Sequence, residues 1–485
     1  MLTYYMAISL KKNILYSSLL TVSNFLFPLL VYPYISRVLG ATNIGICNFI
    51  DSVINYFILF SMMGINTIGI REIAKIKTDT HQLSKTYSSL LSLNLITTCI
   101  ALIALFISVL IIPELAKHKT TMYIGALKLL FNSLLIEWFY KGLENFKFIT
   151  QRSVLIRIAY VILIFLLVKN KEDYNIYYGI TVMTIVINAC INLFYAKKFT
   201  SFSLKIISFE HYLRPYFILG VYYFLTSMYS SFNIAYLGFI AGETEVGYYT
   251  TAVKLYTVLI SLFTAFTGVM MPRMSSLVAE RKYDDFKSLS AKSIDILLLF
   301  VMPIIVLSMM FTPQIISIIS GPGYENAITP MRIIVPLLLI IGYEQIIIIQ
   351  ILTPLKKDKA ILLNSILGAT VGLLMNILLV SDLKSIGSAL VWVIAEIAVL
   401  CSGQYFVTKY LKTSFPYTKI LRQCLMTIPI GCICYMITQM KLNNILTILI
   451  GTGLVMLYYG FINIFILKNE FVLSLISKVK IRNAN

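Results

Sequence analysis

The stretch Gly40-Ala-Thr-Asn-Ile-Gly45 recurs as Gly242-Glu-Thr-Glu-Val-Gly247, at an offset of 202 residues. The same offset carries Arg71 onto Arg273, and each of these arginines follows the next apolar run. Two halves built on one plan, both almost wholly apolar, are typical of membrane transporters, in which the substrate path lies between the halves. We therefore expect the glycine pairs to lie in tight turns, where glycine permits a positive φ or close packing.

The composition supports a membrane protein. Of the 485 residues, 59% are hydrophobic and only 13% are charged, and the mean hydropathy is +0.85. No soluble core needs that much apolar material, so the chain is predicted to be a polytopic membrane protein without room for a soluble domain. A net charge of +19 would suggest nucleic acid in a soluble protein. Here we predict no nucleic-acid partner, because the distribution of the charge explains it better.

A hydrocarbon core of roughly 30 Å needs about 20 apolar residues per helix, and this rule predicts about fourteen spans. Their expected ranges are 13–36, 44–70, 88–112, 120–140, 150–168, 176–196, 215–240, 247–271, 293–312, 328–352, 360–380, 386–408, 419–439 and 445–467. The repeat groups them into a six-helix bundle over 1–200, a second over 201–410, and a helix pair with a cytoplasmic tail over 411–485.

The basic residues set the orientation. Of the 40 Lys and Arg, 29 fall in the even-numbered connections and the two termini, and seven fall in the odd-numbered connections. Basic residues favour the cytoplasmic side, so the even loops and both termini are predicted to be cytoplasmic. Every outer connection is short. Residues 272–292, and their first-half counterpart 71–85, are predicted to be amphipathic helices on the membrane surface.

Charged residues inside the apolar runs are the candidate site, because an ionisable group at membrane depth costs several kcal/mol unless it is paired or hydrated. We expect Asp295 and Arg157 to snorkel or to pair structurally. The remaining acids are assigned to a cleft or to ion coupling, and the cations to substrate binding. The acids are Asp51, Glu137, Glu344 and Glu396, and the cations are Arg37, Lys128, Lys254 and Arg332.

Two of the cations occupy similar positions in the two halves. Lys128 and Arg332 each lie near the start of the fourth predicted helix of their half. Together they could hold an anionic headgroup such as a phosphate or diphosphate, since Arg offers a bidentate fork and Lys a point charge. The alternative is that they form salt bridges to Glu137 or Glu344. Arg37 lies at the outer end of the first span, although basic residues favour the cytoplasmic side. We therefore expect that it either faces the cleft or binds lipid phosphates.

No enzyme motif is present. The three histidines, His81, His118 and His211, are far apart, and the chain has no zinc-protease signature, phosphate-binding loop or nucleophile motif. We therefore expect no catalytic residue, metal or cofactor. Active transport would have to draw on an ion gradient or on a downstream reaction.

The sequence resembles one family over nearly its whole length. The first half carries Pro33-Tyr-Ile-Ser-Arg-Val-Leu-Gly40, Gly64-Ile-Asn-Thr-Ile-Gly-Ile-Arg-Glu72 and Glu137-Trp-Phe-Tyr-Lys-Gly-Leu-Glu-Asn-Phe-Lys147. The second half carries Gly323-Tyr-Glu-Asn-Ala followed by Met331-Arg332. In their order and spacing these motifs resemble bacterial polysaccharide flippases, the O-antigen and capsule repeat-unit translocases of the multidrug/oligosaccharidyl-lipid/polysaccharide exporter superfamily.

The resemblance implies an all-α, MATE-like fold of two pseudo-twofold six-helix bundles around a cleft, in the bacterial inner membrane. It also implies the substrate, an undecaprenyl-diphosphate-linked oligosaccharide moved from the cytoplasmic to the periplasmic leaflet. Membrane lipids, a polysaccharide polymerase, a chain-length regulator and coupling H⁺ or Na⁺ are the partners to consider. Two alternatives stay open: an ion-coupled drug exporter of the same fold, and a membrane glycan polymerase or glycosyltransferase, which the short outer loops disfavour.

Overall fold

The computed structural model describes residues 10–227 and 232–466, which form helices and turns without a β-strand. The chain divides into two compact units, residues 1–247 and 248–485. The first unit contains α1 (Leu10–Met62), α2 (Ile65–Ile76), α3 (Thr80–Ile111), α4 (Pro113–Ala116), α5 (Lys119–Ser133), α6 (Glu137–Gly142), α7 (Phe146–Leu167), η2 (Lys171–Asp173), α8 (Tyr174–Ala196), η3 (Leu204–Ile206), α9 (Glu210–Ser227) and α10 (Phe232–Ala241).

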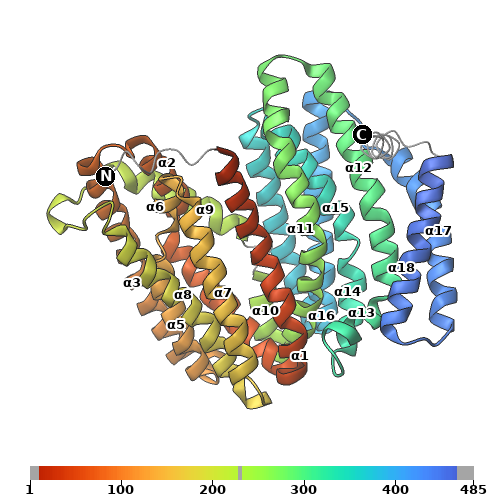
Figure 1. Cartoon of the computed structure of the whole chain (residues 1–485), viewed down its shortest axis with the longest axis horizontal. Coiled ribbons are helices and arrows are strands. Elements are labelled where there is room, and N and C mark those ends of the chain that lie inside the picture. The colour runs from red at the N-terminus through yellow and green to blue at the C-terminus, as the bar shows by residue number, and fades with distance from the viewer. Residues whose placement is uncertain (1–9, 228–231, 467–485) are drawn as a thin grey trace, which may run out of the picture. The chain divides into compact units, whose positions relative to one another are not determined.

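The second unit begins within α11 (Glu243–Ala279). It continues with α12 (Tyr283–Met310), α13 (Thr312–Ile319), η4 (Glu325–Ala327), α14 (Ile328–Ile334), α15 (Leu337–Gln345), the π-helix η5 (Ile346–Leu352), α16 (Asp358–Leu411), α17 (Tyr417–Gln439), α18 (Asn444–Phe461) and η6 (Ile462–Ile466). The helices are drawn in chain order from red to blue in Figure 1. The predicted C-terminal tail from residue 467 lies outside the described residues.

Ten helices in the described ranges are long and apolar enough to cross a membrane, or eleven if a bent pair within α11 counts as one span. Two of the ten are double length. Helix α1 has 53 residues, with a break in helical geometry at Gly40, and α16 has 54, with a break at Lys384. At 1.5 Å per residue each would extend about 80 Å, far beyond a hydrocarbon core of about 30 Å. Each therefore holds two of the predicted spans.

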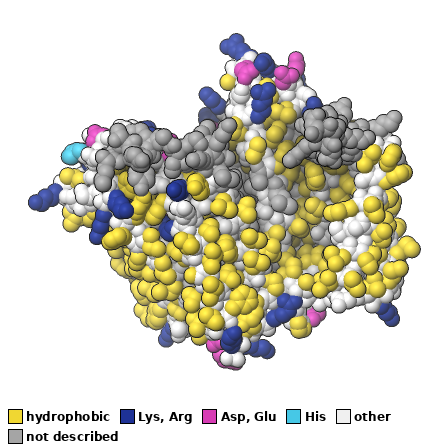
Figure 2. Space-filling model, viewed as in Figure 1, with side chains coloured by type: hydrophobic (Ala, Val, Ile, Leu, Met, Phe, Trp, Pro, Cys, Tyr) yellow, Lys and Arg dark blue, Asp and Glu magenta, His cyan; other side chains and the backbone are white. Residues whose placement is uncertain are grey.

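The surface fits a lipid environment. Large apolar side chains are exposed along the helices, including Leu110 and Ile111 of α3 and Met456 and Leu457 of α18, all about 70% exposed or more. In Figure 2 hydrophobic side chains cover the middle of the helices, while most Lys and Arg side chains on this face lie toward the helix ends. Such an apolar band is costly in water and favourable in a bilayer.

Buried helix contacts hold each unit together. In the first unit α5 packs against α8, α1 and α3, and α1 packs against α7 and α10. A core at one end of this unit contains the fully buried Trp138, Phe139 and Tyr140 of α6, together with Tyr87 of α3. In the second unit α12 packs against α17, and α14 and α15 pack against α16.

The repeated glycines take up the roles expected from the sequence. Gly40 and Gly242 have φ values of +75° and +86°, a region that favours glycine. Gly45 and Gly247 permit close packing instead. A Cβ added at Gly45 would lie 1.7 Å from the Glu243 carbonyl oxygen, and one at Gly247 would lie 2.1 Å from the Ala41 carbonyl oxygen.

The prediction of surface-lying amphipathic helices at 272–292 and 71–85 is wrong. Helix α11 runs on to Ala279, and α12 starts at Tyr283 after a turn in which Arg281 has a positive φ. Figure 1 shows these two helices meeting at that turn. The first-half segment likewise divides between α2 and α3. The charged residues of these two segments lie at the polar ends of helices that are longer than the hydrocarbon core. Helix α11, for example, has 37 residues and spans about 55 Å.

Candidate functional site

A charged cluster lies among three apolar helices of the first unit. Lys128 of α5 is 9% exposed, and its Nζ lies 2.5 Å from Asp51 Oδ1 and 3.0 Å from Asn55 Oδ1 of α1. The Tyr178 hydroxyl of α8 donates to Asp51 Oδ1 over 3.1 Å. An ammonium has three donors. Described residues engage two of them, which leaves one spare donor among the contacts of the described residues.

Local sequence explains how this cluster forms. Asp51 and Asn55 are one turn apart on α1, so their side chains share a face of the helix, and Asn55 Nδ2 donates to Asp51 Oδ2 over 3.3 Å. Gly125 lies nearly one turn before Lys128 on α5. A Cβ there would lie 2.6 Å from Ile54 Cγ1, so glycine lets α5 approach α1 closely enough for the ammonium to reach the carboxylate.

The alternative in which Lys128 pairs with Glu137 does not occur, because Lys128 pairs with Asp51. Helix α5 ends at Ser133, and Glu137 begins α6 after a break at which Ile136 has a positive φ. Glu137 pairs there with Arg152 of α7 at 3.0 Å and with Lys141 at 3.2 Å. Asp51 and Glu137 therefore belong to two separate ion pairs.

Arg152 is a site residue that the sequence reasoning missed. Its side chain is 4% exposed, and besides Glu137 it donates to Asn192 Oδ1 of α8 and to Ser153. Arg152 lies at the start of an apolar run, where it is one of the 29 basic residues that the charge pattern assigns to the cytoplasmic side. The charged residues of the apolar runs marked these networks in the sequence, and the polar residues Asn55 and Asn192 of the same runs were the further signal for their partners.

The second unit brings two predicted acids together. Glu344 of α15 and Glu396 of α16 are 8% and 4% exposed. Their helices pack against each other, and the two carboxyl groups are close enough to interact. Trp392 Nε1 donates to Glu396 Oε1 over 3.0 Å. The alternative of a salt bridge from Arg332 to Glu344 does not occur either: exposed on α14, Arg332 donates from Nε to the Met309 carbonyl over 3.2 Å.

The other predicted residues lie apart from these clusters. Arg37 of α1 donates to the Pro33 carbonyl one turn earlier, over 2.6 Å. Lys254 lies half-buried on α11. Asp295 forms a salt bridge with Lys419 at 2.8 Å, and Arg157 donates to Ser23, so both take up the structural roles predicted for them.

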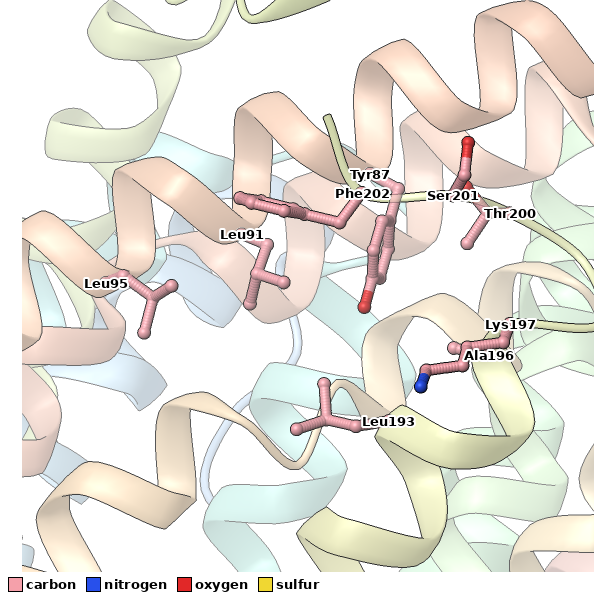
Figure 3. A pocket seen from close by; sticks show the side chains of 9 residues that line it. All are labelled: Tyr87, Leu91, Leu95, Leu193, Ala196, Lys197, Thr200, Ser201 and Phe202. Carbon is pink, nitrogen blue, oxygen red and sulfur yellow. The ribbon is translucent and has the colours of Figure 1, made fainter. Parts of the chain in front are cut away.

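A separate cavity of about 530 Å³ lies between α3, α8 and the segment that follows α8. Its walls are mostly apolar, with Leu91, Leu95 and Leu193 among them. Figure 3 shows the Tyr87 hydroxyl and the Lys197 ammonium directed toward the space between these walls. None of the predicted site residues lines it, so it is distinct from the charged clusters.

Known structures share this fold. A structure described as "Lipid II flippase MurJ, inward closed conformation" matches with a TM-score of 0.69 and 17% identity, over 93% of this chain and 98% of that one. An inward-facing multidrug resistance MATE family transporter of the MOP superfamily matches with a TM-score of 0.61 and 14% identity, over 80% and 96% of the two chains. The predicted all-α, polytopic, MATE-like fold is confirmed.

Sequence relatives point in the same direction. A "Putative O-antigen transporter" of Escherichia coli K12 is 27% identical over 414 residues, which are 82% of this chain and 97% of the relative. It bears the name of a transporter rather than of an enzyme, as the sequence predicts for this chain. The model of a family described as "Polysaccharide biosynthesis protein" matches residues 10–278. This match spans more than half of the sequence, and the chain therefore belongs to the polysaccharide biosynthesis protein family.

Proposed function

We propose that this protein is a flippase that moves undecaprenyl-diphosphate-linked oligosaccharide repeat units from the cytoplasmic to the periplasmic leaflet of the bacterial inner membrane. The family match and the O-antigen transporter relative support the class of substrate. The observation that carries the proposal is the cluster of Lys128, Asp51 and Asn55 inside apolar membrane helices. A chain that only needed to span the bilayer would not maintain such a costly group there.

The cluster suits a phosphorylated sugar headgroup. Burying an unpaired charge or hydroxyl in hydrocarbon costs several kcal/mol, so the headgroup needs polar partners along its path. The spare donor of Lys128 would bind a phosphate oxygen, and the Asn55 amide and Tyr178 hydroxyl would exchange hydrogen bonds with sugar hydroxyls. Because Asp51 balances the ammonium, binding is weak enough for the headgroup to be released. The lipid chain stays in the bilayer.

Arg37, Lys254 and Arg332 are proposed as further contacts for the diphosphate during alternating access. Glu137 belongs to the Arg152 network, which would fix the cytoplasmic end of the first unit. We further propose that residues 1–200 and 201–410 are the moving six-helix bundles and 411–485 an accessory helix pair. Both termini are proposed to be cytoplasmic, and a polysaccharide polymerase and chain-length regulator would use the product.

Deleting the gene tests the function in the host. The proposal predicts that lipid-linked repeat units accumulate on the cytoplasmic leaflet, and that a plasmid copy of the wild-type gene clears them. A Lys128→Met copy should fail to clear them, while Lys119→Met, an exposed lysine at the start of the same helix, should succeed at equal expression. Unchanged leaflet distribution in the deletion strain would argue against a flippase.

An ion-coupled exporter of small cationic molecules is the second candidate. It is favoured by the acidic pair Glu344 and Glu396, which a diphosphate would avoid. Sensitivity of the deletion strain to cationic dyes, with normal surface polysaccharide, would support this candidate over the flippase.

A further inference from the structure

The Glu344–Glu396 pair is a site that headgroup binding does not explain. Two carboxylates cannot form a hydrogen bond with each other, because neither has a proton to donate. Both side chains are buried on helices that pack against each other, with carboxyl groups close enough to interact, so a hydrogen bond between them requires a proton on one carboxyl. Two interacting carboxyl groups that are both buried also do not both remain ionised.

The neighbours of the pair decide which carboxyl carries the proton. Trp392, one turn before Glu396 on α16, donates its indole N–H to Glu396 Oε1. An N–H donor favours the ionised form of the carboxyl that accepts from it. Glu396 is thus the acceptor of both hydrogen bonds, and Glu344 is the protonated donor.

The surroundings favour a proton over a metal ion. Among the described residues, the titratable groups that act on the pair are the two carboxyls and the Tyr256 phenol of α11. Tyr256 is buried, and its ring packs edge-on against Trp392 at 5.1 Å. Its hydroxyl donates to the Leu337 carbonyl of α15 over 3.4 Å. An indole N–H cannot ligate a cation, and hard cations take about six or more oxygen ligands.

We propose that Glu344 and Glu396 form a proton-binding site that joins α15 to α16. Loss of the proton would leave two negative charges facing each other in an apolar contact, and this repulsion favours separation of the two helices. Binding of the proton restores the contact. The site would thereby couple proton movement to the conformation of the second unit, a role that rests on the proposed transport function. The presence of the proton on the pair does not depend on the proposed transport function.

Infrared spectroscopy of the purified full-length protein in lipid nanodiscs tests the occupancy. The wild type should show the C=O stretch of a buried protonated carboxyl at neutral pH. Glu344→Gln should remove this band, because its amide donates to an ionised Glu396. Glu396→Gln should keep the band, because Glu344 still carries the proton. The exposed control Glu114→Gln should leave the band unchanged.

A band that is absent from the wild type or persists in Glu344→Gln would overturn the site. So would a band that is present in potassium buffer and lost in sodium buffer, which indicates a cation. The opposite results expected for Glu344→Gln and Glu396→Gln keep the test informative if one variant fails to fold.

The coupling is tested in proteoliposomes with a fluorescent undecaprenyl-diphosphate-linked disaccharide as the probe. An imposed pH gradient should change the wild-type flipping rate several-fold and leave the Glu344→Gln rate unchanged. Equal responses would overturn the coupling. If the wild type does not flip the probe at all, the proposed function fails, while the infrared result still decides the proton site.

Discussion

Thr42 Oγ1 and Thr244 Oγ1 lie 2.9 Å apart, and the two residues are separated by 202 positions, the offset of the sequence repeat. The glycines obey the same relation: Gly45 abuts the backbone of Glu243, and Gly247 abuts the backbone of Ala41, whose repeat partner is Glu243. Each motif thus contacts the other through equivalent residues, as in an isologous interface. The repeated outer turns form one self-complementary contact within the first unit.

Gly45→Ala is expected to destabilise the protein by about 1–3 kcal/mol, because overpacking forces the backbone apart. The added Cβ would meet Glu243 carbonyl oxygen and carbon at 1.7 Å and 2.6 Å. Thermal unfolding in detergent measures the effect. Gly453→Ala is the matched control, since a Cβ at that position in α18 has no neighbour within 4 Å. Equal midpoints for the two variants would show that the turn contact tolerates a side chain.

Lys128→Met should leave Asp51 without its counter-ion and cost about 1–3 kcal/mol of stability. Asp51→Asn should also destabilise, because it leaves a largely buried ammonium. The double variant should recover part of the loss, since neither charge then remains unpaired. Thermal unfolding of the four proteins gives the coupling energy. Strictly additive losses would mean that the two charges do not interact in the membrane.

Arg152→Met is expected to cost about 3–5 kcal/mol, the effect of breaking a buried ion pair. Arg152→Lys should rescue it only partly, because one ammonium cannot reproduce the guanidinium contacts to Glu137, Asn192 and Ser153. Arg71→Met is the control, since Arg71 is 52% exposed in its pair with Glu72. The measurement is the amount of monodisperse protein after heating. Full rescue by lysine would show that only the positive charge of Arg152 matters, and not its several hydrogen bonds.

Cysteine labelling tests the proposed orientation. In a variant without the seven native cysteines, Lys282→Cys in the α11–α12 turn should react only after the cytoplasmic side is opened to a membrane-impermeant reagent. Lys441→Cys in the α17–α18 turn should react in intact spheroplasts. The two turns follow predicted spans of opposite parity, so labelling of both from the same side would contradict the fourteen-span topology.

Features set by local physics were predictable from the sequence. The glycine pairs were assigned to turns because a repeated glycine indicates a positive φ or a close approach, and both occur at Gly40 and Gly45. The apolar runs likewise predicted the polytopic fold. Partners across helices were not predictable, because hydropathy gives the length of a span and not its rotation. Lys128 therefore pairs with Asp51, 77 residues away in the sequence, and not with Glu137 on the same predicted helix.

Breaks inside predicted spans were the second source of error. The run 120–140 reads as one helix, yet its backbone breaks between α5 and α6, which moves Glu137 into contact with Arg152. Residues 328–352 likewise divide into α14, α15 and η5. Such breaks depend on packing against neighbouring helices, and in transporters they occur where backbone lines a cavity. Apolar composition alone does not reveal them.

The proposed function of this chain is to carry a lipid-linked sugar headgroup across the bilayer. The most direct measurement is the accessibility of a fluorescent undecaprenyl-diphosphate-linked oligosaccharide in proteoliposomes to a membrane-impermeant quencher. With the wild-type protein, quenching should rise beyond the outer-leaflet fraction toward completion, and Lys128→Met should slow this rise at least tenfold relative to Lys119→Met. Quenching that stops at the level of protein-free liposomes would show that the protein does not move the headgroup.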